Sequence, residues 1–290
     1  MIFSLVGGSM LLGFTVSLPL VSVSTAPRPQ VKAAFTSAPA VPFSKSISPP
    51  PVSATGIYIV DLDSGQPLYA KNPNLRLQPA SLTKIMTSLV AMDYYDQTSI
   101  LTVKDGNKAL GAKAELIAGD TLSAESLLYA LLVPSGNDAA LTLAENYPGN
   151  YQAFVAQMNS KVQALNLKNT HFSNVSGIDT PDHYTTAYDI TQIAKTALKR
   201  TRFRNIVATR SISLKSEKGR TYDLTTTNEL LGKPGILGIK TGWTPDAGEC
   251  LITYAVRYGH PVLISLLGST NRFGETEKLL DWVYSNYIWD

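Results

Sequence analysis

The sequence predicts a mixed α/β fold of the α+β type, in which an N-terminal hairpin and C-terminal strands form one antiparallel β-sheet flanked by helices. An all-helical subdomain is expected as an insertion between the two sets of strands. Two observations predict this arrangement. Strand-like runs occur near both ends of the folded part, whereas patterns with the helical period fill the middle. The first hairpin therefore has only the late strands as partners for a shared sheet.

Residues 1–26 carry no charged side chain and are rich in Leu, Val, Phe and Gly. Such a segment predicts a signal peptide for export or an N-terminal membrane anchor, outside the fold. Since the first cationic side chain, Arg28, follows the apolar run instead of preceding it, both alternatives stay open. Residues 27–53 are rich in Pro, Ser and Ala, a composition that predicts a disordered linker.

The folded body, residues 54–290, opens with two β-prone runs on either side of the turn "DSGQ", which predicts a hairpin. A helix is expected to begin near Pro79 and Ser81, because the apolar residues that follow are spaced for one buried face. Further helical patterns between about residues 100 and 200 predict the inserted subdomain. β-prone runs return from Ile206 onward, and "GETEKLLDWVYSNY" predicts a closing helix.

The composition argues against several classes of protein. The net charge of +3 is too weak for the concentrated basic face that nucleic-acid binding normally needs, so no nucleic-acid partner is expected. The single cysteine, Cys250, cannot form an intramolecular disulfide and is expected to be buried as a small hydrophobe. Because one cysteine and three histidines cannot supply a zinc-ligand spacing, no metal or cofactor is predicted.

The first candidate motif is Ser81-Leu82-Thr83-Lys84. Residues three apart on a helix share one face, so the Lys84 amine can hydrogen-bond the Ser81 hydroxyl. A serine hydroxyl needs a neighbouring base to become a nucleophile, and a desolvated lysine near another cation can be that base. Taken alone, however, the pattern favours a helix-capping serine beside a lysine whose stem covers apolar surface.

Two further motifs follow downstream. Ser135-Gly136-Asn137 lies in a turn between two helical patterns, where a capped helix–helix connection is the simplest interpretation. Lys240-Thr241-Gly242 lies on a late strand, and its glycine would let a ligand approach the backbone, although an edge-strand lysine is the simpler interpretation. A phosphate-binding loop is excluded, because Ile239 separates Gly238 from Lys240.

The three motifs gain meaning by occurring together and in order: S-x-x-K at the start of a helix, S-x-N in an inter-helix loop and K-[S/T]-G on a late strand. With them, the chain resembles the serine-type D-Ala-D-Ala carboxypeptidases, the low-molecular-mass penicillin-binding proteins of the β-lactamase/transpeptidase-like fold. The resemblance covers about residues 54–287 and extends to the segments "PASLTKIMT", "GIDTPDHYTTAYD", "IKTGWTPDAGEC" and "NRFGETEKLLDW".

The resemblance implies a role for each motif residue. Ser81 would be the acylated nucleophile and Lys84 its general base. The backbone N–H groups of Ser81 and Trp243 would form the oxyanion hole, and the bulk of Trp243 is expected to narrow the cleft. The other implied residues are Ser135 and Asn137 for proton transfer and substrate alignment, Lys240 for electrostatic support, Gly242 for close approach of the substrate, and Thr241 with Arg272 for its terminal carboxylate.

The implied reaction removes the terminal D-alanine from peptidoglycan stem peptides through an acyl-enzyme on Ser81, which β-lactams would also acylate. The expected partners are therefore the D-Ala-D-Ala stem peptide and β-lactams, met on the extracytoplasmic side, with the membrane contacted only through the N-terminal segment. Three alternatives remain open. They are a D,D-endopeptidase that cuts peptidoglycan cross-links, a class A-like β-lactamase, and a wall-binding module without catalysis.

Overall fold

The computed structural model describes residues 40–104 and 109–289, together with the isolated glycines at 7, 8 and 13. The expected signal peptide or anchor of residues 1–26 and the expected linker up to residue 39 otherwise lie outside the described residues. Within the described part, no helix combines the length and the apolar character needed to cross a membrane.

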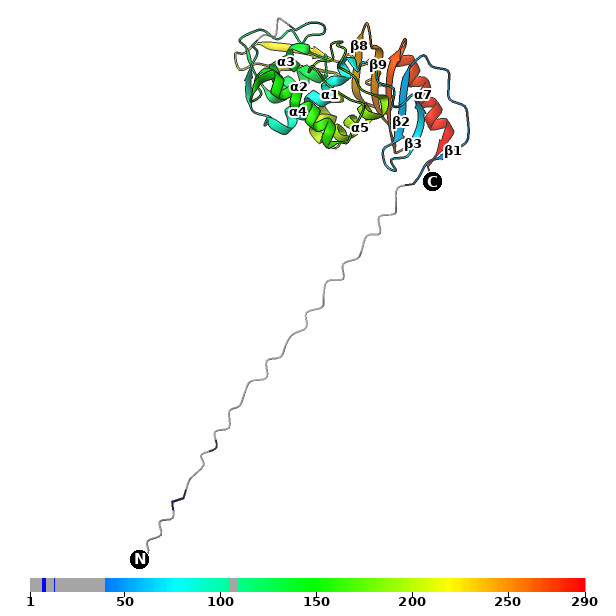
Figure 1. The fold of residues 1–290 in the computed structure, drawn as a ribbon, viewed down its shortest axis with the longest axis horizontal. Coiled ribbons are helices and arrows are strands. Elements are labelled where there is room, and N and C mark those ends of the chain that lie inside the picture. Colours follow the sequence, from blue (N-terminus) through cyan, green and yellow to red (C-terminus); the bar gives the residue numbers. More distant parts are fainter. Residues whose placement is uncertain (1–6, 9–12, 14–39, 105–108, 290) are drawn as a thin grey trace, which may run out of the picture. The chain divides into compact units, whose positions relative to one another are not determined.

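The centre of the fold is a five-stranded antiparallel sheet (Figure 1). In spatial order its strands are β3 (Pro67–Lys71), β2 (Gly56–Asp61), β10 (His260–Ser269), β9 (Gly248–Arg257) and β8 (Ile236–Thr244). The N-terminal hairpin joins the late strands through β2 and β10, with Ile59 directly opposite Ile264. This pairing confirms the predicted sheet and leaves β8, which carries Lys240, as an edge strand.

Helices cover both faces of the sheet (Figure 1). The inserted subdomain packs on one face, where residues such as Tyr58 and Val60 of β2 join a large buried cluster. The alternate residues Ile57 and Ile59 point to the other face, where they pack against the closing helix α7 (Arg272–Asn286). The remaining helices are α1 (Thr83–Tyr94), α2 (Ala124–Leu132), α3 (Asn137–Glu145), α4 (Asn150–Ala164), α5 (Ala187–Leu198) and α6 (Thr201–Val207).

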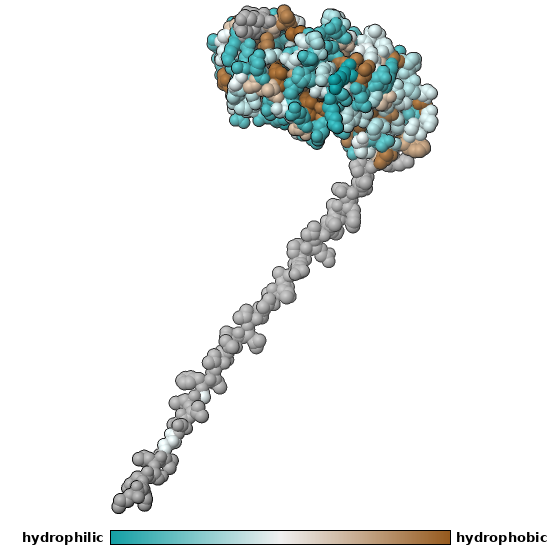
Figure 2. All heavy atoms as spheres, in the orientation of Figure 1, coloured by the Kyte–Doolittle hydropathy of each residue, from teal (hydrophilic) through white to brown (hydrophobic). Residues whose placement is uncertain are grey.

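Apolar side chains lie mainly inside this body. Figure 2 shows one face on which hydrophilic residues predominate and hydrophobic ones are scattered. Cys250 has no exposed surface, as expected. The hydroxyl of Thr186 accepts a hydrogen bond of 2.9 Å from the Asp189 backbone N–H, so this residue caps α5.

The inserted region differs from the prediction in two details. It is mainly rather than wholly helical, because β4 (Ile100–Thr102) and β5 (Thr121–Ser123) pair at the base of a long loop. Ile206 and Val207 end helix α6, although their β-branched side chains indicated a strand, because tertiary burial outweighs intrinsic preference there. The next strands, β6 (Ser211–Lys215) and β7 (Thr221–Thr225), form a separate two-stranded sheet instead of joining the main one.

Residues 40–53, expected within the linker, lie against the folded body. Strand β1 (Phe43–Ser44) pairs with β11 (Tyr287–Ile288), directly after α7. The Glu275 carboxylate accepts hydrogen bonds from the backbone N–H groups of Ser53 and Ala54. Residues 40–53 are attached to the body through backbone groups and the Glu275 carboxylate. Since backbone groups are the same in every sequence, the proline-rich composition did not indicate this contact. The compact unit therefore begins before residue 54.

Candidate active site

Ser81 and Lys84 lie where a short 3₁₀ turn, η1 (Ala80–Leu82), runs directly into α1. The Lys84 amine nitrogen is 2.8 Å from the Ser81 hydroxyl oxygen. The same nitrogen donates a hydrogen bond of 2.8 Å to the backbone carbonyl of Ser176. Lys84 is 0% exposed, so the amine is held between these two oxygen atoms without contact with bulk solvent.

The turn that carries Ser81 is fixed by close backbone contacts. Ala80 has a positive φ of 47°. This conformation costs an alanine free energy, so it persists only where the surrounding structure imposes it. The Thr83 hydroxyl donates to the Ala80 carbonyl oxygen at 2.8 Å. A Cβ atom on Gly177 would lie 1.8 Å from that carbonyl oxygen, and one on Gly242 would lie 3.0 Å from the Ser81 nitrogen. Both glycines therefore allow backbone segments to approach the turn.

Ser135 lies in the connection between α2 and α3, whereas Asn137, expected in that loop, is the first residue of α3. Ser135 has a φ of 68°, which turns the chain sharply between the two helices. Asn137 is oriented from both ends, since its backbone N–H donates to the Ala112 carbonyl at 2.8 Å and its side-chain amide donates to the Leu110 carbonyl. Among the described residues, the buried Ser135 hydroxyl and the Asn137 side-chain oxygen have no hydrogen-bond partner. Buried polar atoms without a partner are rare in folded proteins, and both of these residues line the cavity described below.

Lys240 and Thr241 lie on β8, at the edge of the main sheet. The Lys240 amine donates to the Thr241 carbonyl at 3.0 Å, and Lys240 is 1% exposed. The Thr241 hydroxyl is 2.6 Å from the hydroxyl of Thr227, a residue that the sequence motifs did not indicate. Thr227 lies just after β7, so only the folded chain brings the two threonines together.

Burial and a neighbouring cation weaken proton binding by each of the two lysines. Burial and the nearby Lys240 charge hold the pKa of Lys84 well below its usual value, and the Asp138 carboxylate opposes this effect in part. Burial and the Arg272 charge lower the pKa of Lys240 to about 7. A neutral Lys84 has a lone pair that can accept the Ser81 proton, so the environment suits a general base.

These residues surround one cavity of about 540 Å³, a size typical of small-ligand sites. Lys84 and Lys240 are buried behind its lining. Trp243 is 61% exposed at its rim. The Arg272 guanidinium donates to the Gly242 carbonyl at 3.1 Å and keeps its Nε without a described partner. The sequence-predicted residues in the lining are Ser81, Ser135, Asn137, Thr241, Gly242, Trp243 and Arg272.

Several residues of the site escaped the motifs. Besides Thr227, they include the backbone of residues 110–112 and the pair Ser176 and Gly177. The segment "GIDTPDHYTTAYD" signalled the position of Gly177. Asp138 carries no motif signal, although its carboxylate accepts hydrogen bonds from the backbone N–H groups of Ala114 and Leu116 and so anchors the loop just after residues 110–112, which line the cavity.

The chain is similar to several known proteins. The family model Peptidase S11, described as D-alanyl-D-alanine carboxypeptidase, matches residues 43–271. A Bacillus subtilis relative named D-alanyl-D-alanine carboxypeptidase DacF is 33% identical over 244 residues, which make up 81% of this chain but only 63% of that protein. A Pseudomonas aeruginosa relative named D-alanyl-D-alanine endopeptidase is 29% identical over 273 residues, 84% of each chain. The crystal structure of the Streptomyces K15 DD-transpeptidase matches with a TM-score of 0.78 and 32% identity, over 82% of this chain and 100% of that one.

Proposed function

The chain belongs to the Peptidase S11 family of D-alanyl-D-alanine carboxypeptidases, and we propose that it removes the terminal D-alanine from peptidoglycan stem peptides through an ester on Ser81. The observation that carries this proposal is the distance of 2.8 Å between the Lys84 nitrogen and the Ser81 oxygen, with Lys84 fully buried beside a second cation. A lysine in that environment can act as a base toward the hydroxyl.

Acylation begins when neutral Lys84 takes the proton of the Ser81 hydroxyl. The Ser81 oxygen then bonds to the carbonyl carbon of the penultimate D-alanine. The backbone N–H groups of Ser81 and Trp243 stabilise the resulting oxyanion, a contribution that is typically worth about 100- to 1,000-fold in rate per donor. As the tetrahedral intermediate collapses, the peptide C–N bond breaks. The proton passes from Lys84, with Ser135 as a relay, to the leaving amine of the terminal D-alanine.

Deacylation uses water. A water molecule attacks the ester carbonyl and gives a proton to the network of Lys84 and Ser135, which returns a proton to the Ser81 oxygen. The shortened peptide leaves with a new carboxylate. A β-lactam would follow the first step in the same way, because its strained amide presents a carbonyl carbon to Ser81, and would remain attached while deacylation is slow.

The other two cations of the site, Lys240 and Arg272, would attract the terminal carboxylate of the substrate. Thr241 offers a hydroxyl, and Arg272 keeps an N–H group without a described partner close to the cavity. Lys240 adds positive charge from behind the lining. Asn137 would orient the amide of the substrate through its unpartnered side-chain oxygen. An uncharged or amidated C-terminus would lose the charge-assisted part of this binding.

Peptidoglycan lies outside the cytoplasm, so the site of action is extracytoplasmic. Residues 1–26 would either direct export or tether the enzyme to the membrane, with residues 27–39 as a spacer. The membrane is expected to matter only through that segment.

The proposal is tested by two assays on the purified protein. Incubation with fluorescent penicillin is expected to give a long-lived covalent label, and incubation with a peptide ending in D-Ala-D-Ala is expected to release D-alanine. Ser81→Ala should abolish both activities. Ser88→Ala is the matched control, since it removes a buried hydroxyl from the same helix away from the cavity and should retain both. Rapid turnover of penicillin without D-alanine release would indicate a β-lactamase. The absence of any label would refute the proposal that the protein is an enzyme.

A second candidate function is cleavage of peptide cross-links. The relative from Pseudomonas aeruginosa supports it, since that protein is named an endopeptidase and matches 84% of this chain. The chemistry at Ser81 would be unchanged, because only the group attached to the leaving amine differs. Comparing the hydrolysis of a cross-linked stem-peptide dimer with that of a single stem peptide separates the two functions.

A further inference from the structure

Strand β7 presents an unpaired backbone edge. In the β6–β7 sheet, Asp223 lies opposite Ser213. The same register continues beyond both ends of the two strands. There the Ser216 N–H donates to the Arg220 carbonyl and the Thr226 N–H donates to the Arg210 carbonyl, each at 2.8 Å. Antiparallel pairs alternate, so the even-numbered residues of β7 bond to β6 and the odd-numbered ones face away from it. No described residue accepts a hydrogen bond from the outward-facing amides at 223 and 225.

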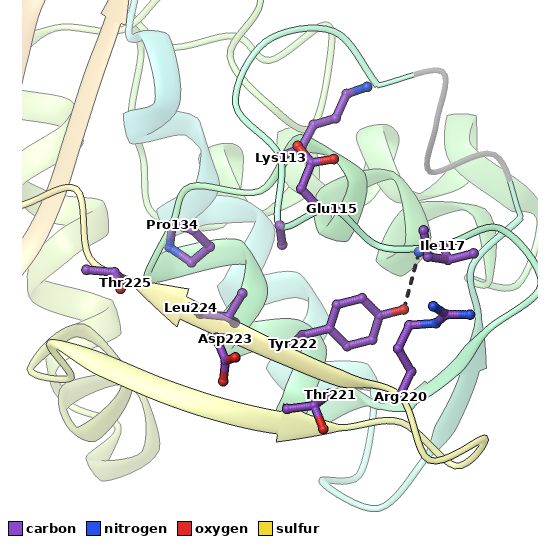
Figure 3. A pocket seen from close by; sticks show the side chains of 11 residues that line it. Lys113, Glu115, Ile117, Pro134, Arg220, Thr221, Tyr222, Asp223, Leu224 and Thr225 are labelled. Atoms are coloured by element: carbon purple, nitrogen blue, oxygen red, sulfur yellow. Dashed lines mark hydrogen bonds between the residues drawn. The ribbon is translucent and has the colours of Figure 1, made fainter.

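A pocket of about 370 Å³ runs along this edge (Figure 3). All five residues of β7 line it, and the facing wall is formed by Pro134 and the loop of residues 113–117. The Tyr222 hydroxyl bridges the two walls at one end, accepting from the Ile117 backbone N–H at 3.3 Å and donating to the Asp120 carboxylate at 2.6 Å. Because this contact and the Asp138 carboxylate fix the loop, the space beside β7 is held open.

The pocket carries charges of both signs. Arg220 extends beside its Tyr222 end and is 54% exposed, although it also lies 3.5 Å from the Asp120 carboxylate. Lys113 is the second cation of the lining. Glu115 and Asp223 contribute carboxylates. A strand edge flanked by both signs of charge suits an extended peptide with both carboxylate and amine groups, which can add a strand through backbone hydrogen bonds.

This pocket adjoins the catalytic cavity. Each of three segments in its lining continues within two residues into the lining of that cavity. The successive pairs are Ala114 and Ala112, Pro134 and Ser135, and Thr225 and Thr227. The two hollows are therefore lined by the same three stretches of the chain.

We propose that the β7 pocket binds a second, extended stem peptide of the wall polymer as an added β-strand, while the first stem peptide occupies the catalytic cavity. The inference rests on the proposed function, because it assigns the second arm of a cross-linked substrate of the same site. The edge of β7 supplies backbone N–H and C=O groups at residues 221, 223 and 225. The charged walls select a peptide that carries both an amine and free carboxylates. The pocket thereby favours cross-linked over single stem peptides.

The test compares two proline variants at directly opposed positions of one hairpin, both in the Ser81→Ala background so that no substrate is consumed. Asp223→Pro removes an amide that faces the pocket together with one of the pocket's carboxylates, whereas Ser213→Pro removes an amide on the far edge of β6. Both lose the same side-chain hydrogen bond between Ser213 and Asp223, so they are matched in that respect. Proline is tolerated at outward-facing edge positions, and thermal denaturation checks that both variants fold.

Calorimetry then measures the binding of a synthetic cross-linked stem-peptide dimer and of a single stem pentapeptide. The Ser81→Ala protein should bind the dimer about tenfold more tightly than the pentapeptide. Asp223→Pro should abolish that preference and Ser213→Pro should keep it. Glu115→Lys changes an exposed side chain and leaves the strand unaltered. It should weaken the binding of the dimer but not the binding of the pentapeptide. Equal binding of dimer and pentapeptide, or equal effects of the two prolines, would overturn the proposal.

The outcome is independent of the chemistry at Ser81. Fluorescent penicillin applied to the protein with Ser81 intact tests the proposed function, and Asp223→Pro should label as fast as the unsubstituted protein. If labelling and D-alanine release both fail while the dimer preference depends on Asp223, the proposed function is refuted and the β7 site stands. If labelling and D-alanine release succeed but the protein binds the dimer no more tightly than the pentapeptide, the β7 site is refuted and the proposed function stands.

Discussion

The Lys84 nitrogen lies 2.8 Å from the Ser81 oxygen, with no exposed surface on the lysine side chain. As an ammonium group, Lys84 donates to Ser81 and to the Ser176 carbonyl, but it must remain charged in a buried place near Lys240. As a neutral amine, it keeps the bond to Ser176 and offers its lone pair to the Ser81 proton. Burial and like charge both favour the neutral form, so the fold prepares the pair for proton transfer.

Replacing Lys84 by methionine should separate catalysis from stability. The Lys84→Met side chain is of similar length and does not titrate, so it removes a buried ionisable amine without leaving a large cavity. The acylation rate by penicillin should fall by about 100- to 10,000-fold, the usual contribution of a general base. The free energy of unfolding should stay the same or increase. Stopped-flow acylation and urea denaturation measure the two quantities, and a variant that acylates at the original rate would exclude Lys84 as the base.

The pH dependence of acylation should have two limbs with different origins. The rate rises with pH as Lys84 loses its proton, at a pKa well below that of a free lysine. Lys240, whose pKa is about 7, is cationic below that pH, where the proposed mechanism has it attract the carboxylate of the substrate. Above about pH 7 the charge is lost, so the second-order rate constant should fall again for carboxylate substrates. Lys240→Arg cannot lose its charge in this range and should lack the falling limb. If the rate constant of Lys240→Arg also fell above about pH 7, a group other than Lys240 would be the cause.

Gly242→Ala should damage the site through geometry alone. Its Cβ would lie 3.0 Å from the Ser81 nitrogen and from the Ala80 Cβ, forcing β8 and the 3₁₀ turn apart. A displacement of about 1 Å at a reacting group can cost about 100-fold in rate, so acylation should fall by that order. Gly56→Ala is the control, since its Cβ would meet the flexible end of Leu77 at the same 3.0 Å, away from the cavity. Equal acylation by the two variants would contradict the prediction.

His183 should make stability depend on pH. Its Nδ1 accepts from the Ser173 N–H at 3.0 Å, so the proton is on Nε2, which lies 2.8 Å from the Thr83 hydroxyl. Burial is the main cause that lowers the pKa of His183 to about 3, whereas an unfolded histidine titrates near 6.5. Between those values the unfolded state binds more protons, so the free energy of unfolding should decrease as the pH falls from about 6.5 toward 3.

His183→Gln provides the comparison for this effect. The variant should be less stable at pH 7, because it loses the hydrogen bonds to Ser173 and Thr83. It should lose less stability than the unsubstituted protein on acidification, since glutamine does not titrate. Urea denaturation at pH 7 and pH 5 should therefore show a smaller gap between the two proteins at the lower pH. A gap that stays constant or widens would rule out a neutral, buried His183.

The sequence contained the local part of the site. The spacing of Ser81 and Lys84 places both on one helical face, and the periodic apolar residues predict the buried helix around them. The shared sheet was predicted because the N-terminal hairpin had only the late β-prone runs as partners, but the order of its strands was not. No motif assigned a role to His183, which is buried and hydrogen-bonded to Thr83 beside the turn of Ser81.

Features that depend on tertiary contact could not be predicted. The pairing of Thr227 with Thr241 joins two segments that no local pattern connects. The positive φ of Ala80 depends on Gly177, almost a hundred residues later in the chain, which leaves room for its carbonyl. Strand β1 attaches through backbone groups that every sequence possesses, so its composition indicated only a linker. Such contacts depend on which surfaces meet, and no period or motif encodes that.

The most direct test of the account is to locate the covalent adduct. The protein is incubated with penicillin at neutral pH, digested and mapped by mass spectrometry. The predicted result is a penicilloyl group on the peptide that contains Ser81, formed at a much lower rate in Lys84→Met and absent in Ser81→Ala. An adduct on Ser135 or any other residue, or unchanged labelling after loss of Lys84, would contradict the assignment of Ser81 and Lys84 as nucleophile and base.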